Sequence, residues 1–177
     1  MIGYFTENGK LKEMHDSAFN HMYDFKMKYL GKDFSGKVVD VGSRDINGSF
    51  KSLFEKCDYL GIDIVPGDNV DLVLEDQYDW KEIKSNSVDV VISGSTLEHI
   101  EDDRAVMHEI TRILKPKGLT CIIVPSKGHK HCLPDYRRYQ IDDMRMLAES
   151  ANLRQIECRI SFVSYWGDCV LVAQKNG

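Results

Sequence analysis

The stretch 37–50, KVVDVGSRDINGSF, carries an apolar run directly into an acid, a glycine and a polar turn. Its Val-rich start predicts a buried strand over residues 38–41, after which Gly42 allows the chain to turn. A buried strand that enters a glycine turn before a helix is how α/β proteins hold a nucleotide-like ligand. A second short apolar strand, 59–62, ends at Asp63 roughly 20 residues further on, where such sites place a carboxylate that binds ribose hydroxyls.

Strands and helices alternate along the chain, which predicts an α/β fold with a parallel sheet covered by helices on both faces. Apolar runs predict strands at 38–41, 59–62, 70–74, 88–93, 119–124, 155–162 and 168–174. Apolar residues at three- and four-residue steps predict helices at 14–29, around 50–54, from about 102, and near 142–151. The linker 163–167 is too short for a crossover helix, so the last two strands should pair antiparallel.

The first predicted helix has an apolar stripe on one face, formed by Met14, Ala18, Met22, Phe25 and Tyr29. We interpret this stripe as part of the core and not as a partner surface. Gly31 and then Ser35-Gly36 should end the helix. The segment 115–118, KPKG, should end the helix that begins near residue 102, because proline cannot continue a helix and glycine tolerates the turn.

The composition favours one domain with a full core, since the 177 residues are 42% hydrophobic and 29% charged. We divide it into a helical prelude, 1–36, and a core, 37–177, with an acceptor loop at about 126–140. The net charge of −5 argues against a broad phosphate-binding surface. We therefore do not expect nucleic acid as a partner.

The five cysteines include no CxxC pair and lie at Cys57, Cys121, Cys132, Cys158 and Cys169. An odd, scattered set favours reduced thiols. The first residues lack a basic segment followed by a long apolar run, and no later segment reaches the roughly 18 apolar residues that span a bilayer. We therefore expect a cytoplasmic protein with no membrane association.

Polar and small residues follow each of the first four predicted strands. They are Asp40 and Gly42 after the first strand, Asp63 after the second, Glu75-Asp76-Gln77 after the third and Ser93-Gly94-Ser95 after the fourth. Because open parallel sheets bind ligands at the carboxyl ends of their strands, these four loops should converge on one crevice.

These motifs, in this order, resemble the class I S-adenosylmethionine-dependent methyltransferases, and more closely the small bacterial and phage-type members with a minimal methyltransferase domain. The resemblance covers 38–175 and rests on VDVGS at 39–43, GID at 61–63, VDVVIS at 88–93, LEHI at 97–100 and ILKPKGL at 113–119. It implies a three-layer sandwich around a seven-stranded, mostly parallel, Rossmann-like sheet with an antiparallel last strand. The cofactor would be S-adenosylmethionine, and the product S-adenosylhomocysteine.

The resemblance also implies roles for single residues. Gly42 would let the backbone approach the methionine part of the cofactor, Asp40 would bind near its amino group, and Asp63 would hold the ribose diol. Ile64 would pack on the adenine, with Asp76 or Glu75 accepting from its amino group and Gln77 beside it. The full expected cofactor set is Asp40, Gly42, Ser43, Arg44, Gly48, Asp63, Ile64, Asp76, Gln77, Ser93, Gly94 and Ser95.

The first loop departs from the family pattern of three glycines at alternate positions after the acid. Arg44 and Ile46 stand where the second and third glycines would fall, so Asn47-Gly48 takes over the turn at the start of the helix. Gly48 before Ser49 suits an N-terminal turn and cap.

Two groups of residues point to the methyl acceptor. His99 follows the fourth strand and is a candidate base, although alignment of the acceptor with the methyl group can suffice without one. The acceptor loop contributes His129, His131, Tyr136, Arg137 and Arg138, of which the arginines suit an anionic acceptor or are simply solvated. Tyr4, Phe5 and His15 either close the site or belong to a packing helix. His129, His131 and Cys132 have ligand-type side chains, but without a clear fourth ligand we expect no metal.

The sequence thus predicts an enzyme that transfers a methyl group to an oxygen or nitrogen nucleophile of a small molecule, a metabolite or a saccharide-like compound. So little of the chain lies outside the cofactor framework that specificity would come from a small acceptor, from a homo-oligomer or from a partner subunit. A nicotinamide-dependent oxidoreductase is the first alternative, and the missing GxGxxG argues against it. The second is a non-catalytic module of the same fold that serves assembly or regulation.

Overall fold

The computed structural model describes residues 13–46 and 48–177, and its strands form one sheet in the order β3-β2-β1-β4-β5-β7-β6. The strands are β1 (Lys37–Val41), β2 (Asp58–Asp63), β3 (Leu72–Val73), β4 (Val88–Gly94), β5 (Leu114–Pro125), β6 (Leu153–Ser161) and β7 (Asp168–Lys175). β7 runs antiparallel to both neighbours, and the other pairs are parallel. The predicted seven-stranded sheet with a final antiparallel pair is confirmed.

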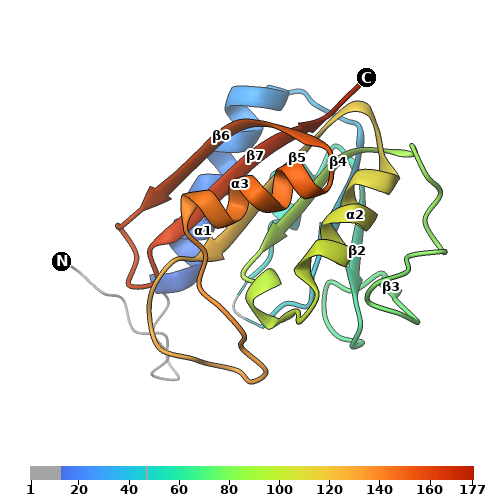
Figure 1. Cartoon of the computed structure of the whole chain (residues 1–177). Coiled ribbons are helices and arrows are strands. Elements are labelled where there is room, and N and C mark those ends of the chain that lie inside the picture. Colours follow the sequence, from blue (N-terminus) through green and yellow to red (C-terminus); the bar gives the residue numbers. More distant parts are fainter. Residues whose placement is uncertain (1–12, 47) are drawn as a thin grey trace.

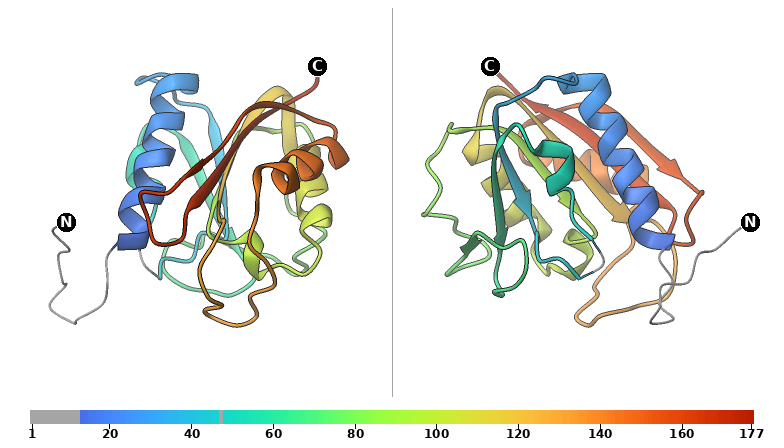
Figure 2. Two further views of the ribbon diagram at one scale, coloured as in Figure 1. Left: turned by 60° about the vertical axis from the view of Figure 1, so that its left-hand side comes forward. Right: turned by 180° about the vertical axis from the view of Figure 1, so that it is seen from behind.

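Helices cover both faces of the sheet (Figure 1). The helical segments are α1 (Glu13–Phe25), η1 (Lys26–Leu30), η2 (Lys51–Phe54), η3 (Leu97–His99), α2 (Asp103–Ile113) and α3 (Ile141–Ser150). Figure 2 shows α1 on one side of the sheet, with α2 and α3 on the other. The result is the three-layer arrangement that the sequence predicts.

The central strands are apolar on both faces because each face packs against a separate core. Val38 belongs to the core under α1, whereas Val39, the next residue, belongs to the core under α2 and α3. Ala18, Met22 and Phe25 of α1 are buried in the first of these cores, so the stripe is core as predicted for these residues. Met14, which begins the predicted stripe, lies outside the described side chains.

The helix ends follow the predicted stop signals only in part. Gly31 has φ +84° and donates from its backbone N to the carbonyl of Lys26, which closes the π-helical turn η1. The segment 115–118, in contrast, lies inside β5, because the strand begins at Leu114, directly after α2. Lys117 takes a positive φ there, and the register with β4 shifts between Val88 and Val90.

Two other predicted elements are shorter than expected. The helix around 50–54 is a single 3-10 turn, η2, and the strand at 70–74 is reduced to the two residues of β3. The following segment, 74–87, forms neither helix nor strand although it crosses from β3 to β4. Its backbone is held instead by Arg112 of α2, which donates to the carbonyls of Trp80 (2.8 Å) and Ile83 (2.9 Å).

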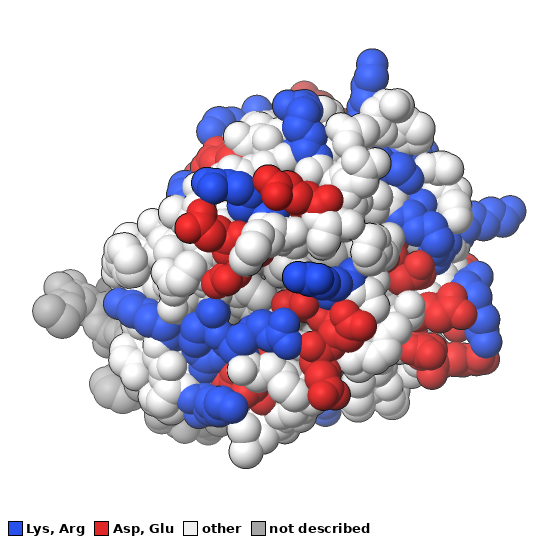
Figure 3. All heavy atoms as spheres, viewed as in Figure 1, with Lys and Arg blue, Asp and Glu red and all other residues white. Residues whose placement is uncertain are grey.

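The surface carries charges of both signs. Figure 3 shows Lys and Arg side chains interspersed with Asp and Glu over the face seen in Figure 1. None of the helices in the described residues has the length and apolar character needed to cross a membrane.

Candidate cofactor and acceptor site

The carboxyl ends of β1, β2 and β4 open into a cavity of about 440 Å³, which lies within the size range of small-molecule sites. Most of the residues predicted from sequence line it: Asp40, Gly42, Ser43, Arg44, Gly48, Asp63, Ile64, Gln77, Gly94, Ser95, His99 and His131. The strand order explains this convergence, because β1 lies between β2 and β4 and all three run in the same direction.

Gly42 lies at the turn after β1, in the left-handed region with φ +74°. A Cβ atom at this position would lie 2.1 Å from Oγ1 of Thr96, so no side chain fits. Thr96 lines the cavity, and its hydroxyl lies 3.2 Å from the carbonyls of both Val41 and Gly94. Sequence reasoning missed Thr96, whose importance depends on a contact with a residue 54 positions earlier in the chain.

Asp40 is almost fully buried, with 3% of its surface exposed. Burial raises the pKa of its carboxyl to about 7, although the Tyr59 hydroxyl donates to Oδ2 and opposes that shift. Tyr59 in turn accepts from the side-chain amide of Asn69 at 3.3 Å. The floor of the cavity near the start of the glycine turn therefore holds an acid whose proton is bound far more tightly than usual.

Asp63 ends β2 and lies at the cavity wall. Its carboxylate accepts from the backbone N of Val65 at 3.0 Å and from that of Arg44 at 3.3 Å, which fixes its orientation. A carboxylate accepts several hydrogen bonds at once, so these contacts leave lone pairs for hydroxyl groups of a ligand. The Arg44 side chain lies against the next loop, because a Cβ at Gly67 would come within 2.9 Å of its Cγ and Nε.

Two residues of the expected cofactor set lie away from the cavity lining. Asp76 is exposed and accepts from the backbone N of Tyr78 in a local turn. Ser93 is fully buried within the sheet and donates to the carbonyl of Val41 at 3.0 Å. Ser93 thus ties β4 to the end of β1, beneath the cavity.

One wall of the cavity is apolar and was only partly foreseen. Ile64 lies there, and the structure adds Leu74, Trp80, Ile100 and Val106. Trp80 is buried, and its indole N donates to the carbonyl of Gln77 at 2.9 Å.

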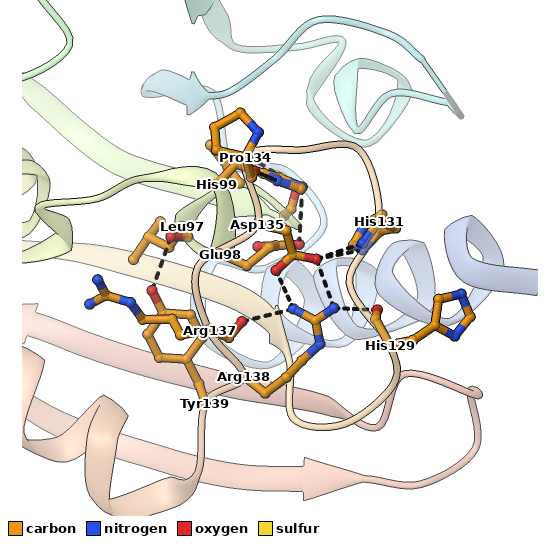
Figure 4. A network of polar contacts seen from close by, with 12 residues as sticks. Leu97, Glu98, His99, His129, His131, Pro134, Asp135, Arg137, Arg138 and Tyr139 are labelled. Atoms are coloured by element: carbon orange, nitrogen blue, oxygen red, sulfur yellow. Dashed lines mark hydrogen bonds and ion pairs between the residues drawn. The ribbon is translucent and has the colours of Figure 1, made fainter.

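Glu98, His99 and His131 come together beside the cavity, which the two histidines line (Figure 4). Nδ1 of His99 lies 2.7 Å from the carbonyl O of Pro134, and Nδ1 of His131 lies 3.0 Å from Oδ2 of Asp135. Burial raises the pKa of the Glu98 carboxyl to about 8, and burial together with the nearby His99 lowers that of His131. Sequence reasoning placed Glu98 and His99 together after the fourth strand and His131 in the acceptor loop, but it did not predict that the three side chains meet.

The arginines of the acceptor loop are engaged within the protein. Arg138 bonds both oxygens of Asp135 and also donates to the carbonyls of Lys127 and His129 (Figure 4). Arg137 pairs with the buried Asp103 at 2.6 Å. These contacts fold the loop and hold it against α2.

The remaining residues of the loop lie further out. His129 and Tyr136 are exposed, and His129 contacts the Tyr165 hydroxyl at 3.0 Å. Cys132 is exposed but reaches the cavity rim. Tyr4 and Phe5 lie outside the described residues, and nothing is described of the His15 side chain.

Comparison with known proteins identifies the family of the chain. The model of a family described as methyltransferase domain matches residues 17–122. No curated protein matches the chain significantly.

Several solved structures share the fold. The Burkholderia thailandensis 1,6-didemethyltoxoflavin-N1-methyltransferase, with bound 1,6-didemethyltoxoflavin and S-adenosylhomocysteine, is 15% identical at a TM-score of 0.71, covering 93% of this chain and 84% of that one. The Haemonchus contortus phosphoethanolamine N-methyltransferase 2, in complex with S-adenosylmethionine, is 16% identical and has a TM-score of 0.67. The match covers 89% of this chain and 53% of that one. The [4+2]-cyclase SpnF is 14% identical and has a TM-score of 0.66. The match covers 98% of this chain and 86% of that one.

The family match spans more than half of the chain and includes β1, β2 and β4, which form the cavity. The strand order, with its antiparallel final pair, is that of the methyltransferase sheet predicted from the motifs. The chain therefore belongs to the class I S-adenosylmethionine-dependent methyltransferases, as its sequence motifs predict.

Proposed function

We propose that the protein binds S-adenosylmethionine in the cavity and transfers its methyl group to an oxygen or nitrogen nucleophile of a small molecule. The observation that carries this proposal is the convergence of Gly42, Asp63 and Gly94 from three strand ends on one cavity. The bound cofactor supplies an electrophilic methyl group on a sulfonium, and S-adenosylhomocysteine is released.

Different residues of the cavity would contact different parts of the cofactor. Asp63, oriented by two backbone N–H groups, would accept from the ribose diol, and Ile64 would cover the adenine with Gln77 beside it. The turn at Gly42 brings the backbone close to the methionine part, which Asp40 would reach near the amino group. These are roles that carboxylates and close backbone approach perform well.

On the acceptor side, His99 is the proposed base. Its Nδ1 donates to the carbonyl of Pro134, which leaves the lone pair on Nε2 to take a proton from the acceptor. Transfer from a sulfonium also proceeds by alignment alone, in which case His99 only shapes the pocket.

The acceptor we propose is a metabolite or a saccharide-like compound. Supporting this, the Burkholderia neighbour holds a small molecule beside the cofactor product. The interspersed charges on the face in Figure 3 do not form a single-sign field that would attract nucleic acid. We also propose that the protein works in the cytoplasm and that a homo-oligomer or a partner subunit completes its specificity.

Calorimetric titration with S-adenosylmethionine, and separately with S-adenosylhomocysteine, tests the cofactor site. Asp63→Ala should weaken binding at least about tenfold, because a charge-assisted hydrogen bond to a hydroxyl is lost. Asp58→Ala is the matched control, since Asp58 is exposed at the opposite end of the same strand. A folded, cofactor-free protein that binds neither ligand would refute the proposal.

The alternative is a non-catalytic module of the same fold. Arg44, which lines the cavity where the family has a glycine, is the observation that favours it. Because such a module could keep the fold with or without the cofactor, the two functions are distinguished by release of S-adenosylhomocysteine in the presence of candidate acceptors, which a non-catalytic module would not show.

A further inference from the structure

We propose that Glu98, His99 and His131 form a binding site for a divalent first-row transition-metal ion at the acceptor side of the cavity. One potential ligand atom from each residue lies within 4.8 Å of the other two. The proposal revises the expectation from sequence that the chain has no metal site.

Glu98 provides the first observation. Its side chain is completely buried in η3, and among the described residues neither carboxylate oxygen has a hydrogen-bond partner. A carboxylate out of water and without a partner is costly, so this position requires either a proton or a cation. Oε1 lies 3.8 Å from Nε2 of His99, a separation that an ion between the two would close by a small movement.

The second observation is how the two imidazoles are oriented. Nδ1 of His99 faces the backbone carbonyl of Pro134, and Nδ1 of His131 faces the carboxylate of Asp135 (Figure 4). In metal sites, an outer carbonyl or carboxylate holds a histidine in this way, placing the proton on one ring nitrogen and the lone pair on the other. His99 is thus prepared to present Nε2 as a ligand, whereas Nδ1 of His131 lies 3.0 Å from Oδ2 of Asp135 without forming a hydrogen bond to it.

The outer residues are themselves fixed. Asp135 is buried, and it accepts from Arg138 and from the backbone N of His131 at 2.9 Å. The acceptor loop therefore positions His131 relative to η3, from which Glu98 and His99 come. His131 lies 32 residues after His99 in the chain, so the site joins two distant segments.

The donor set selects the kind of ion. Two imidazoles and one carboxylate suit Zn²⁺, Fe²⁺ or Co²⁺, whereas Mg²⁺ prefers oxygen ligands throughout. Three protein ligands leave open coordination positions, and His99 and His131 both line the cavity. With an ion bound, His99 is a ligand and no longer a base.

The ion also suggests a class of methyl acceptor, and this part of the inference rests on the proposed function. A bound ion favours acceptors with an oxygen atom that can occupy one of its open coordination positions. Binding of the ion itself does not depend on methyl transfer, so the two are tested separately.

The first experiment is titration of tag-free, metal-free protein with Zn²⁺, without cofactor, together with absorption spectra of the Co²⁺ form. We expect a single ion per chain, d–d bands of a nitrogen and oxygen site, and much weaker binding of Mg²⁺. Glu98→Gln, His99→Gln and His131→Gln should each weaken Zn²⁺ binding at least about tenfold. His99 is partly exposed, so its variant keeps the test valid if Glu98→Gln does not fold.

Two variants serve as controls. His108→Gln removes an exposed imidazole on α2, and Cys132→Ser removes the thiol at the cavity rim. Both should bind Zn²⁺ like the wild type. The proposal is overturned if folded protein binds neither Zn²⁺ nor Co²⁺, if binding survives in the cluster variants, or if Cys132→Ser abolishes it.

The acceptor class has its own probe. Acetohydroxamate, a bidentate oxygen ligand, should alter the Co²⁺ spectrum by entering the open positions. An unchanged spectrum would overturn the oxygen-acceptor inference. If the wild-type protein binds Zn²⁺ but not S-adenosylmethionine, the proposed function is refuted and the metal site is not.

Discussion

Gly42 and Thr96 lie so close that a Cβ on the glycine would be 2.1 Å from the threonine Oγ1 and 2.4 Å from its Cγ2. The pair joins the turn after β1 to the segment after β4, and both residues line the cavity. The shape of the cavity at the carboxyl end of the sheet thus depends on the absence of one side chain.

Gly42→Ala should destabilise the protein by about 2–4 kcal/mol, because the new methyl group collides with Thr96 and alanine disfavours a positive φ. Cofactor affinity should fall as well. Urea unfolding and calorimetry measure the two effects. The double variant Gly42→Ala/Thr96→Gly removes the collision but not the backbone cost, so a coupling of at least about 1 kcal/mol is expected. Strict additivity would contradict the steric explanation.

Asp40 should make stability depend on pH. The pKa of its carboxyl is about 7 in the folded protein against 3.8 for the ordinary group, so the folded chain holds an extra proton between these values. Unfolding free energy should therefore fall as pH rises from about 4 to 7 and then level off, by at most about 4 kcal/mol from this group.

Asp40→Asn isolates this contribution, since the amide cannot ionise and still accepts from Tyr59. Wild type and variant should have similar stability at about pH 3.5, just below the ordinary pKa of 3.8, and the variant should be the more stable near pH 8. Urea unfolding at both pH values checks this. Parallel pH profiles would mean that Asp40 does not titrate in this range.

Much of the fold was predictable because the sheet is buried on both faces. The apolar runs at 38–41 and 88–93 became β1 and β4, the central strands, and the short linker 163–167 correctly indicated an antiparallel pair. The elements around 50–54 and 70–74 were predicted to be longer than they are. Their apolar residues lie in a single 3-10 turn and in a two-residue strand at the edge of the sheet.

The site was predictable where one short motif supplies the residue, and not where distant segments meet. Asp63 is the last residue of its strand, so the local pattern sufficed to place it at the cavity. Thr96 and Glu98 acquire their roles only through contacts with residues far away in the chain, Gly42 and His131. No local periodicity encodes such contacts.

Arg112 should be critical for the irregular segment 74–87. It bonds Glu109 and the carbonyls of Trp80 and Ile83, and Glu109 accepts from the backbone N of Trp80 at 2.8 Å. Arg112→Ala removes the guanidinium bonds to Glu109 and to both carbonyls and should cost about 2–4 kcal/mol. Cofactor affinity should also fall, because Trp80 lines the cavity.

Arg104→Ala is the matched control for that prediction, because Arg104 is an exposed arginine on the same helix. It should change stability by less than about 0.5 kcal/mol. Chemical denaturation followed by tryptophan fluorescence measures both variants. Equal effects of the two substitutions would show that Arg112 does not support the segment.

Glu157 of β6 connects the strand to the end of the N-terminal helix. It accepts from Lys28 and from the Tyr29 hydroxyl, both at 2.6 Å, and pairs with Arg159 at 2.7 Å. These partners lower the pKa of the Glu157 carboxyl from 4.5 to about 2, with its hydrogen bonds to Lys28 and Tyr29 as the largest causes.

Because the folded-state pKa is depressed, Glu157 stabilises the protein above about pH 4.5, and this contribution disappears as pH falls to about 2. Its side chain is 25% exposed, so solvent screening reduces the effect at neutral pH to about 1–2 kcal/mol. Glu157→Gln should lower the free energy of unfolding by that amount at pH 7 and differ little from the wild type near pH 2. Glu149→Gln, at an exposed site on α3, is the control and should match the wild type throughout. Unfolding curves measured across this range check the prediction, and a pH-independent loss in Glu157→Gln would assign the effect to packing instead of charge.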